Sequence, residues 1–170
     1  SIKSSVTIDR DTANGPGSDA MNGYGSEIAN LGDLDGDGVV DIAVGDRGYN
    51  DESSGAVYIH YLNSNGSVKS TVKLDNSVNL TDGDEYGSDI ANMGDLDGDG
   101  VIDIAVGAEG DDRRGPETGA VWIHYLNTDG SIKSSVRIDK DTTNGPNIRA
   151  EGHYGSSVEN IGDLDGDGVN

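Results

Sequence analysis

Short apolar runs bounded by glycine and acidic residues recur along the chain, and their pattern predicts β-strands. Residues 42–45 and 104–107 both read Ile-Ala-Val-Gly, which is typical of a short buried strand closed by a turn. Longer segments such as 55–63 mix β-branched and aromatic residues at strand length. No stretch shows a sustained apolar period of 3.6 residues, so we predict no helix.

The strand-like segments repeat at a period of roughly 65 residues. Each repeat contains four of them, separated by turn signals such as Asn65-Gly66 and Asp129-Gly130. Four short antiparallel strands per repeat indicate an all-β, β-propeller-type array of four-stranded blades. The expected strands are Tyr-Gly-Ser to Asn-x-Gly (24–32, 86–94), Asp-Ile-Ala-Val-Gly (41–45, 103–107), Gly-Ala-Val-x-Ile-His-Tyr-Leu-Asn (55–63, 119–127) and Ser-x-Lys-Ser-x-Val-x-(Ile/Leu)-Asp (67–75, 131–139).

We divide the chain into repeat 1 (1–66, preceded by an outer strand of a previous blade), repeat 2 (67–130) and a partial repeat 3 (131–170), which contains Tyr154-Gly155-Ser156. About two and a half repeats leave sheet edges open. The sequence is therefore expected to be a fragment of a longer protein or a unit that completes its blades by association. In both cases we expect contacts between copies, as head-to-tail self-association giving a ring or a filament.

An acidic loop follows the first strand of each repeat and reads Asp-x-Asp-Gly-Asp-Gly, with a further acid at position 9 in the first two copies. Such a loop surrounds one point with carboxylates, and a glycine at position 6 allows the sharp turn. Their mutual repulsion would cost several kcal/mol without a cation. We predict Ca²⁺ sites in which the valines ligate through their carbonyls: Asp33, Asp35, Asp37, Val39 and Asp41; Asp95, Asp97, Asp99, Val101 and Asp103; Asp163, Asp165, Asp167 and Val169.

The loop is not an EF-hand, although it begins like one. An EF-hand needs a bidentate acid at position 12 and a helix on each side, whereas position 12 is Val44 or Val106 here. The given sequence ends at Asn170, which is position 8 of the third loop. The last ligand of that loop is therefore expected to come from water, Asn170 or residues beyond the chain.

Taken together, the Tyr-Gly-Ser element and the sequence Gly-Asp-Leu-Asp-Gly-Asp-Gly-x-x-Asp-Ile-Ala-Val-Gly closely resemble the FG-GAP repeat of integrin α-subunit heads and their prokaryotic relatives. Tyrosine replaces the usual phenylalanine, and the Gly-Ala-Pro element lacks its proline. The resemblance covers nearly the whole chain. It implies a seven-bladed propeller with Tyr-Gly-Ser strands innermost, extracellular or cell-surface placement, Ca²⁺ in hairpin loops, and a role in adhesion or ligand recognition.

Composition narrows the possible partners and compartment. The net charge is −21, from 32 acidic and 11 basic residues, and no basic patch exists for nucleic acid or an anionic membrane. No apolar run is long enough to insert into a membrane, and there is no cysteine. Ca²⁺ sites of modest affinity fill constitutively outside cells, which again favours an extracellular location.

Other chemistry-bearing residues carry weaker signals. We expect His60 and His124 to pack or lie at the surface, Trp122 to be a strand aromatic, and Arg113-Arg114 to sit in a solvated turn. No active-site motif is found, and the chain is therefore predicted not to be an enzyme. Segments of variable length (10–23, 76–85 and 140–153; 47–54 and 111–118) are the expected contacts for a protein or glycan. The alternative function is an accessory segment of a larger secreted enzyme that binds its glycan or protein substrate.

Overall fold

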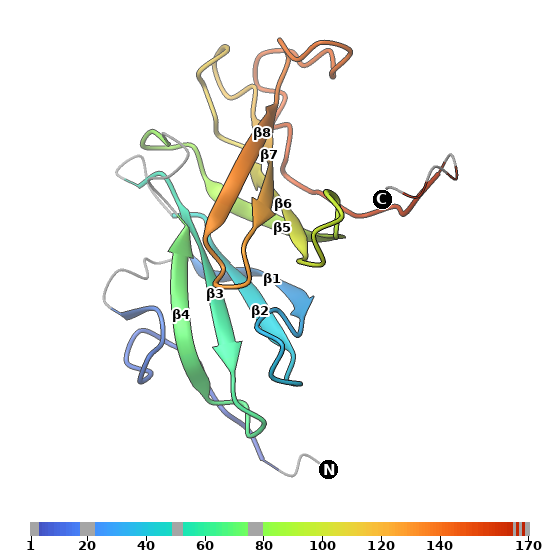
Figure 1. Cartoon of the computed structure of the whole chain (residues 1–170). Helices are drawn as coiled ribbons and strands as arrows, with labels where there is room; N and C mark the ends of the chain where they lie inside the picture. The colour runs from blue at the N-terminus through green and yellow to red at the C-terminus, as the bar shows by residue number, and fades with distance from the viewer. Residues whose placement is uncertain are drawn as a thin grey trace.

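The fold consists of two four-stranded antiparallel sheets, each of which follows the chain order of its strands. The computed structural model describes residues 4–17, 23–48, 53–74, 80–164, 166 and 168. Blade 1 comprises β1 (Tyr24–Gly32), β2 (Asp41–Asp46), β3 (Ala56–Leu62) and β4 (Val68–Leu74), and blade 2 comprises β5 (Tyr86–Gly94), β6 (Asp103–Ala108), β7 (Ala120–Leu126) and β8 (Ile132–Ile138). Figure 1 shows the two blades packed together. No helix occurs within these described ranges, which confirms the all-β prediction.

The two blades share one register. Ile42 of β2 lies opposite His60 of β3, and Ile104 of β6 lies opposite His124 of β7 in the same way. The ladder between the first two strands is irregular at matching places, before Gly32 in one blade and before Gly94 in the other. The repeated sequence therefore specifies a repeated backbone, and the eight strands lie where the pattern predicts them.

The main hydrophobic core lies between the blades. Strand β5 packs against β1 and β2, so the two Tyr-Gly-Ser strands meet at the joint. Leu31 and Ile59 of blade 1 are fully buried there, as are Ile104 and Leu126 of blade 2. A second, smaller cluster around Ala91, Ala105 and Val121 lies on the opposite face of blade 2, where Tyr154 and Val158 cover it.

Backbone groups of the two blades approach closely at the joint. Gly55 forms a parallel bridge with Tyr86, and Gly119 forms the same bridge with Tyr154. Asparagine amides add a second link, because Nδ2 of Asn92 donates to the Asn30 carbonyl at 2.7 Å. In the next repeat, Nδ2 of Asn160 donates to the Asn92 carbonyl at 3.0 Å.

Two further predicted strands are not formed. Residues 4–9, which carry the described part of the expected outer strand, have no strand pairing, and neither do residues 155–162. Tyr154 makes only the isolated bridge to Gly119. A strand exists through its ladder partner, and neither segment has a neighbouring strand of its own blade among the described residues.

Candidate metal centre

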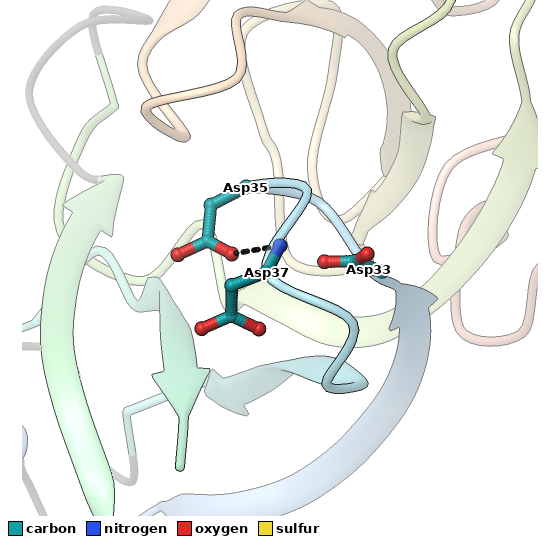
Figure 2. Close-up of side chains that lie close together, drawn as sticks. All are labelled: Asp33, Asp35 and Asp37. Carbon is teal, nitrogen blue, oxygen red and sulfur yellow. Dashed lines mark hydrogen bonds between the residues drawn. The ribbon is translucent and has the colours of Figure 1, made fainter. Parts of the chain in front are cut away.

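The turn between β1 and β2 is held in shape by hydrogen bonds from its own backbone to its own aspartates. The Gly38 amide donates to Oδ2 of Asp33 at 2.8 Å, and the Val39 amide donates to Oδ1 of Asp37 at 2.9 Å. The Asp37 amide donates to Oδ1 of Asp35 at 3.2 Å, as Figure 2 shows. Gly36 and Gly38 have φ angles of 77° and 87°, which residues with a Cβ adopt only with strain. The sequence of the loop thus dictates a tight turn that gathers carboxylates.

Three carboxylates of each turn converge in space. Asp33, Asp35 and Asp37 each offer one oxygen, and these oxygens lie within 4.8 Å of one another. Asp95, Asp97 and Asp99 form the same group in blade 2. Ca²⁺ binds oxygen at 2.3–2.6 Å, so two of its ligands lie at most about 5 Å apart. Each triad, meaning 33/35/37 or 95/97/99, therefore fits a hard divalent cation in spacing and in chemistry.

Asp41 and Asp103, the acids at position 9, accept hydrogen bonds from the backbone. Asp41 is only 1% exposed, and its two carboxylate oxygens accept the backbone amides of Leu34 and Leu62, each at 3.0 Å. Asp103 accepts the amides of Leu96 and Leu126 in the same way. These residues fasten the acidic turn to the third strand of the blade. Burial raises the pKa of both carboxyls, while the amide hydrogen bonds act in the opposite direction.

The remaining predicted ligands are only partly visible. Oδ1 and Oδ2 of Asp163 accept the amides of Gly166 and Gly168, at 2.7 and 2.8 Å, so the third turn begins as the second does. Asp165, Asp167, Val169 and Asn170 lie outside the described residues. Ligation by Asp41 and Asp103, by the carbonyls of Val39 and Val101, and throughout the third loop stays a prediction.

A lysine that the sequence pattern does not reveal completes each of the first two turns. Nζ of Lys69, on β4, lies 2.7 Å from Oδ2 of Asp35 and 2.6 Å from Oδ2 of Asp37. Lys133, on β8, repeats both contacts with Asp97 and Asp99 at the same distances. The hydrogen bond from Lys69 lowers the pKa of Asp37, and that from Lys133 lowers the pKa of Asp99. The recurring Ser-x-Lys-Ser segment was the available signal, but only the strand pairing shows which turn the lysine reaches.

The residues that we predicted to be structural prove to be packed inside the blades. His60 and His124 are fully buried, which supports a packing role and excludes a surface one. Trp122 stacks on His124, with ring centroids 6.0 Å apart. The guanidinium carbons of Arg113 and Arg137 lie 5.5 and 5.9 Å from the centroid of the Trp122 ring. Trp122 is thus a packed strand aromatic, as predicted.

The prediction of a solvated turn at Arg113-Arg114 is wrong for Arg113. Its guanidinium pairs with Asp111 and with Asp84 (3.0 Å), which are 0% and 1% exposed. Arg114 lies 3.5 Å from Asp139 and 3.4 Å from Asp141. Burial of a carboxylate is costly unless a cation pairs with it, and the two arginines provide this positive charge to acids of neighbouring loops.

The variable segments border one open cavity of about 600 Å³. Its walls carry Glu85, Glu109, Glu117, Arg47 and His153, all from loops around the joint between the blades. Arg47 lies 3.4 Å from Glu109, and His153 lies 3.4 Å from Glu117. Burial, together with the neighbouring Glu109, raises the pKa of Glu85. The loops therefore form a polar, mainly acidic hollow, which suits a polar or cationic ligand group.

Comparison with known sequences agrees with this architecture. The family profile of the FG-GAP-like repeat matches residues 33–106, a span that begins at the first acidic turn and includes the second. Integrin alpha-4 of Xenopus laevis is 31% identical over 137 residues, covering 80% of this chain and 13% of the integrin. Integrin alpha-6 of Gallus gallus is 33% identical over 145 residues, covering 84% of this chain and 12% of the integrin.

The chain thus spans about an eighth of the length of the integrins it matches. The predicted resemblance to the FG-GAP repeat is confirmed. Over the described ranges, no helix is long and apolar enough to cross a membrane.

Proposed function

We propose that this chain, which belongs to the FG-GAP-like repeat family, is an extracellular calcium-binding module for adhesion or ligand recognition. Its relatives are integrin α-subunits, which supports a recognition role at the cell surface. Where Ca²⁺ is millimolar, as outside cells, sites of modest affinity are filled constitutively. We propose no catalytic role, because the clustered carboxylates are arranged as chelators.

The observation that carries the proposal is the duplicated triad. Two turns that are 62 residues apart in sequence (Asp33 to Asp95) bring three carboxylate oxygens together within the same 4.8 Å. Asp33, Asp35 and Asp37 would hold one Ca²⁺, and Asp95, Asp97 and Asp99 a second. The bound ion supplies positive charge that offsets carboxylate repulsion and ties the β1–β2 or β5–β6 hairpin together.

The calcium sites are structural in this proposal, and recognition takes place elsewhere. The acidic hollow lined by Glu85, Glu109 and Glu117 is formed by the variable loops, and loops on a rigid frame are the usual carriers of specificity. Ordered hairpins keep the blades rigid, so the hollow keeps its shape. A polar protein segment or a glycan is the class of ligand that such a surface fits.

Direct calcium titration tests the metal role. Protein stripped with EDTA and dialysed should bind Ca²⁺ in isothermal titration calorimetry, with at least two sites per chain. A double variant, Asp35→Asn with Asp97→Asn, should lose most of the binding. Undetectable binding by the parent chain at millimolar Ca²⁺ would contradict the proposal.

A glycan array, combined with a pull-down from cell-surface extract, tests the recognition role. Ligands should be retained in Ca²⁺ by the parent chain and lost by a double variant, Glu85→Gln with Glu109→Gln. Unchanged retention by that variant would place recognition outside the hollow.

A further inference from the structure

The first two acidic turns each receive the side-chain ammonium of one lysine from the fourth strand of their own blade. Lys69 bridges Oδ2 of Asp35 and Oδ2 of Asp37 at 2.7 and 2.6 Å. Lys133 bridges Asp97 and Asp99 with identical distances. The same three-atom arrangement in two independent blades indicates a feature specified by the repeat and not an accidental surface pair.

The lysine takes the oxygens that the first turn leaves available. Oδ1 of Asp35 and Oδ1 of Asp37 accept backbone amides of the turn, and the ammonium takes Oδ2 of each residue. The carboxylates are thus oriented by the backbone on one side and neutralised by a cationic group on the other. Charge-assisted hydrogen bonds of this kind are short and strong compared with neutral ones.

We propose that Lys69 and Lys133 are built-in competitors of the divalent cation, which keep the turns assembled without Ca²⁺ and set the concentration at which Ca²⁺ binds. This inference rests on the calcium role proposed above and assigns the residue that regulates it. Each ammonium supplies one positive charge to a triad of three carboxylates, and it contacts only two of them. A divalent ion can contact all three, so it neutralises the triad more completely than the ammonium that it displaces.

The competition has a direct electrostatic cause. Ca²⁺ and the ammonium would share carboxylates, so they would lie only a few ångströms apart and repel each other. Even at the dielectric constant of water, a divalent and a monovalent charge about 5 Å apart repel enough to weaken binding by about tenfold. Binding of Ca²⁺ therefore requires that the ammonium moves out of the turn, and Lys69 and Lys133 are partly exposed, so they can do so.

Replacement of the two lysines by methionine tests the inference, because methionine keeps an unbranched side chain and removes the charge. The double variant Lys69→Met/Lys133→Met should bind Ca²⁺ about tenfold more tightly in isothermal titration calorimetry. Lys140→Met is the control, since Nζ of Lys140 pairs with Asp141 at 3.1 Å beyond the end of β8. That control should change the dissociation constant by less than about twofold, because a distant surface charge is screened.

Thermal melting supplies a second readout that needs no calcium binding. In EDTA, the double lysine variant should melt below the parent chain, because its carboxylates lose their only cationic partner in the described turns. In millimolar Ca²⁺, the difference should vanish or reverse. Unchanged or weaker Ca²⁺ binding by a folded variant overturns the inference and leaves the calcium role intact. Absence of Ca²⁺ binding in parent and variant alike overturns the calcium role itself.

Discussion

Tyr24 donates its phenolic hydrogen to Nε2 of His60 at a distance of 2.7 Å. Nδ1 of His60 lies 2.7 Å from the Thr71 hydroxyl, which itself donates to the Asn14 carbonyl at 2.6 Å. The Thr71 hydroxyl donates its one hydrogen to this carbonyl, so it must accept a hydrogen bond from Nδ1 of His60. His60 is therefore the tautomer that carries its proton on Nδ1. The chain of hydrogen bonds runs from β1 through β3 to β4, and Tyr86, His124 and Ser135 repeat it in blade 2.

We expect the stability of the protein to fall as the pH drops from 6.5 towards 4. Burial lowers the pKa of His60 and of His124 from 6.5 to about 4. Between these pH values, histidines of the unfolded chain bind protons that the buried histidines of the folded chain do not. Protonation therefore favours the unfolded state and lowers the free energy of unfolding. The loss is at most about 3 kcal/mol for each histidine by pH 4, of which about 2 kcal/mol is reached at pH 5. Urea unfolding in EDTA at pH 7.5 and pH 5 measures it.

The groups that contact His60 are uncharged over this pH interval. Tyr24 is neutral throughout the interval, and burial, followed by the charges of Asp46 and Asp9, raises its pKa further, to about 12. Tyr58 stacks on the imidazole with centroids 6.2 Å apart. The double variant His60→Gln/His124→Gln should lose less stability over the same pH interval than the parent chain. An equal loss in both proteins would assign the pH dependence to carboxylates instead.

Calcium should raise the melting temperature. A ligand that binds only the folded state stabilises it by about 2.7 kcal/mol at a hundredfold excess over the dissociation constant. Differential scanning calorimetry in EDTA and in Ca²⁺ should therefore give different midpoints for the parent chain. The variant Asp35→Asn/Asp97→Asn should respond weakly, whereas the exposed Asp112→Asn should respond like the parent. The same midpoint for the parent in both buffers would count against structural calcium.

Gly55→Ala should open the joint between the blades. A Cβ at Gly55 would lie 2.2 Å from the Tyr86 carbonyl oxygen, and φ is +84°. Gly83 has the same φ of +84° with nothing within 4 Å of its Cβ position, so Gly83→Ala isolates the cost of the backbone conformation. We expect about 1 kcal/mol for Gly83→Ala and at least about 2 kcal/mol more for Gly55→Ala. An equal loss of unfolding free energy in the two variants would show that the joint accommodates the added methyl group without further destabilisation.

Head-to-tail self-association stays a prediction, and blade 1 supplies a residue with which to test it. Ile28 is 59% exposed, whereas Ile90, its counterpart in blade 2, is 5% exposed because blade 1 covers it. A second copy that packed on Ile28 would bury it in the same way. Sedimentation velocity over a concentration and Ca²⁺ series should show association, and Ile28→Ser should reduce it. A monomer at every concentration with Ca²⁺ present would rule out this contact.

Local pattern was enough to predict the strands and the acidic turns, because alternation, β-branching and glycine spacing are properties of short segments. It did not reveal Lys69 beside Asp35 or Tyr24 beside His60, since these pairs are 34 and 36 residues apart and meet only through the sheet register. Arg113 was misjudged for a related reason. An acidic neighbourhood in sequence indicates solvation, whereas Asp84 and Asp111 are in fact buried.

The asparagine and glycine contacts between blades have an evolutionary consequence. Every repeat carries the groups that make these contacts: a main-chain carbonyl, a glycine and one asparagine amide. The amide contact occurs twice in succession, from Asn92 to Asn30 and from Asn160 to Asn92. A tandem duplication of one gene segment would therefore encode a new blade whose docking partners already exist. Copy number can change in whole units, while the loops of each unit diverge independently.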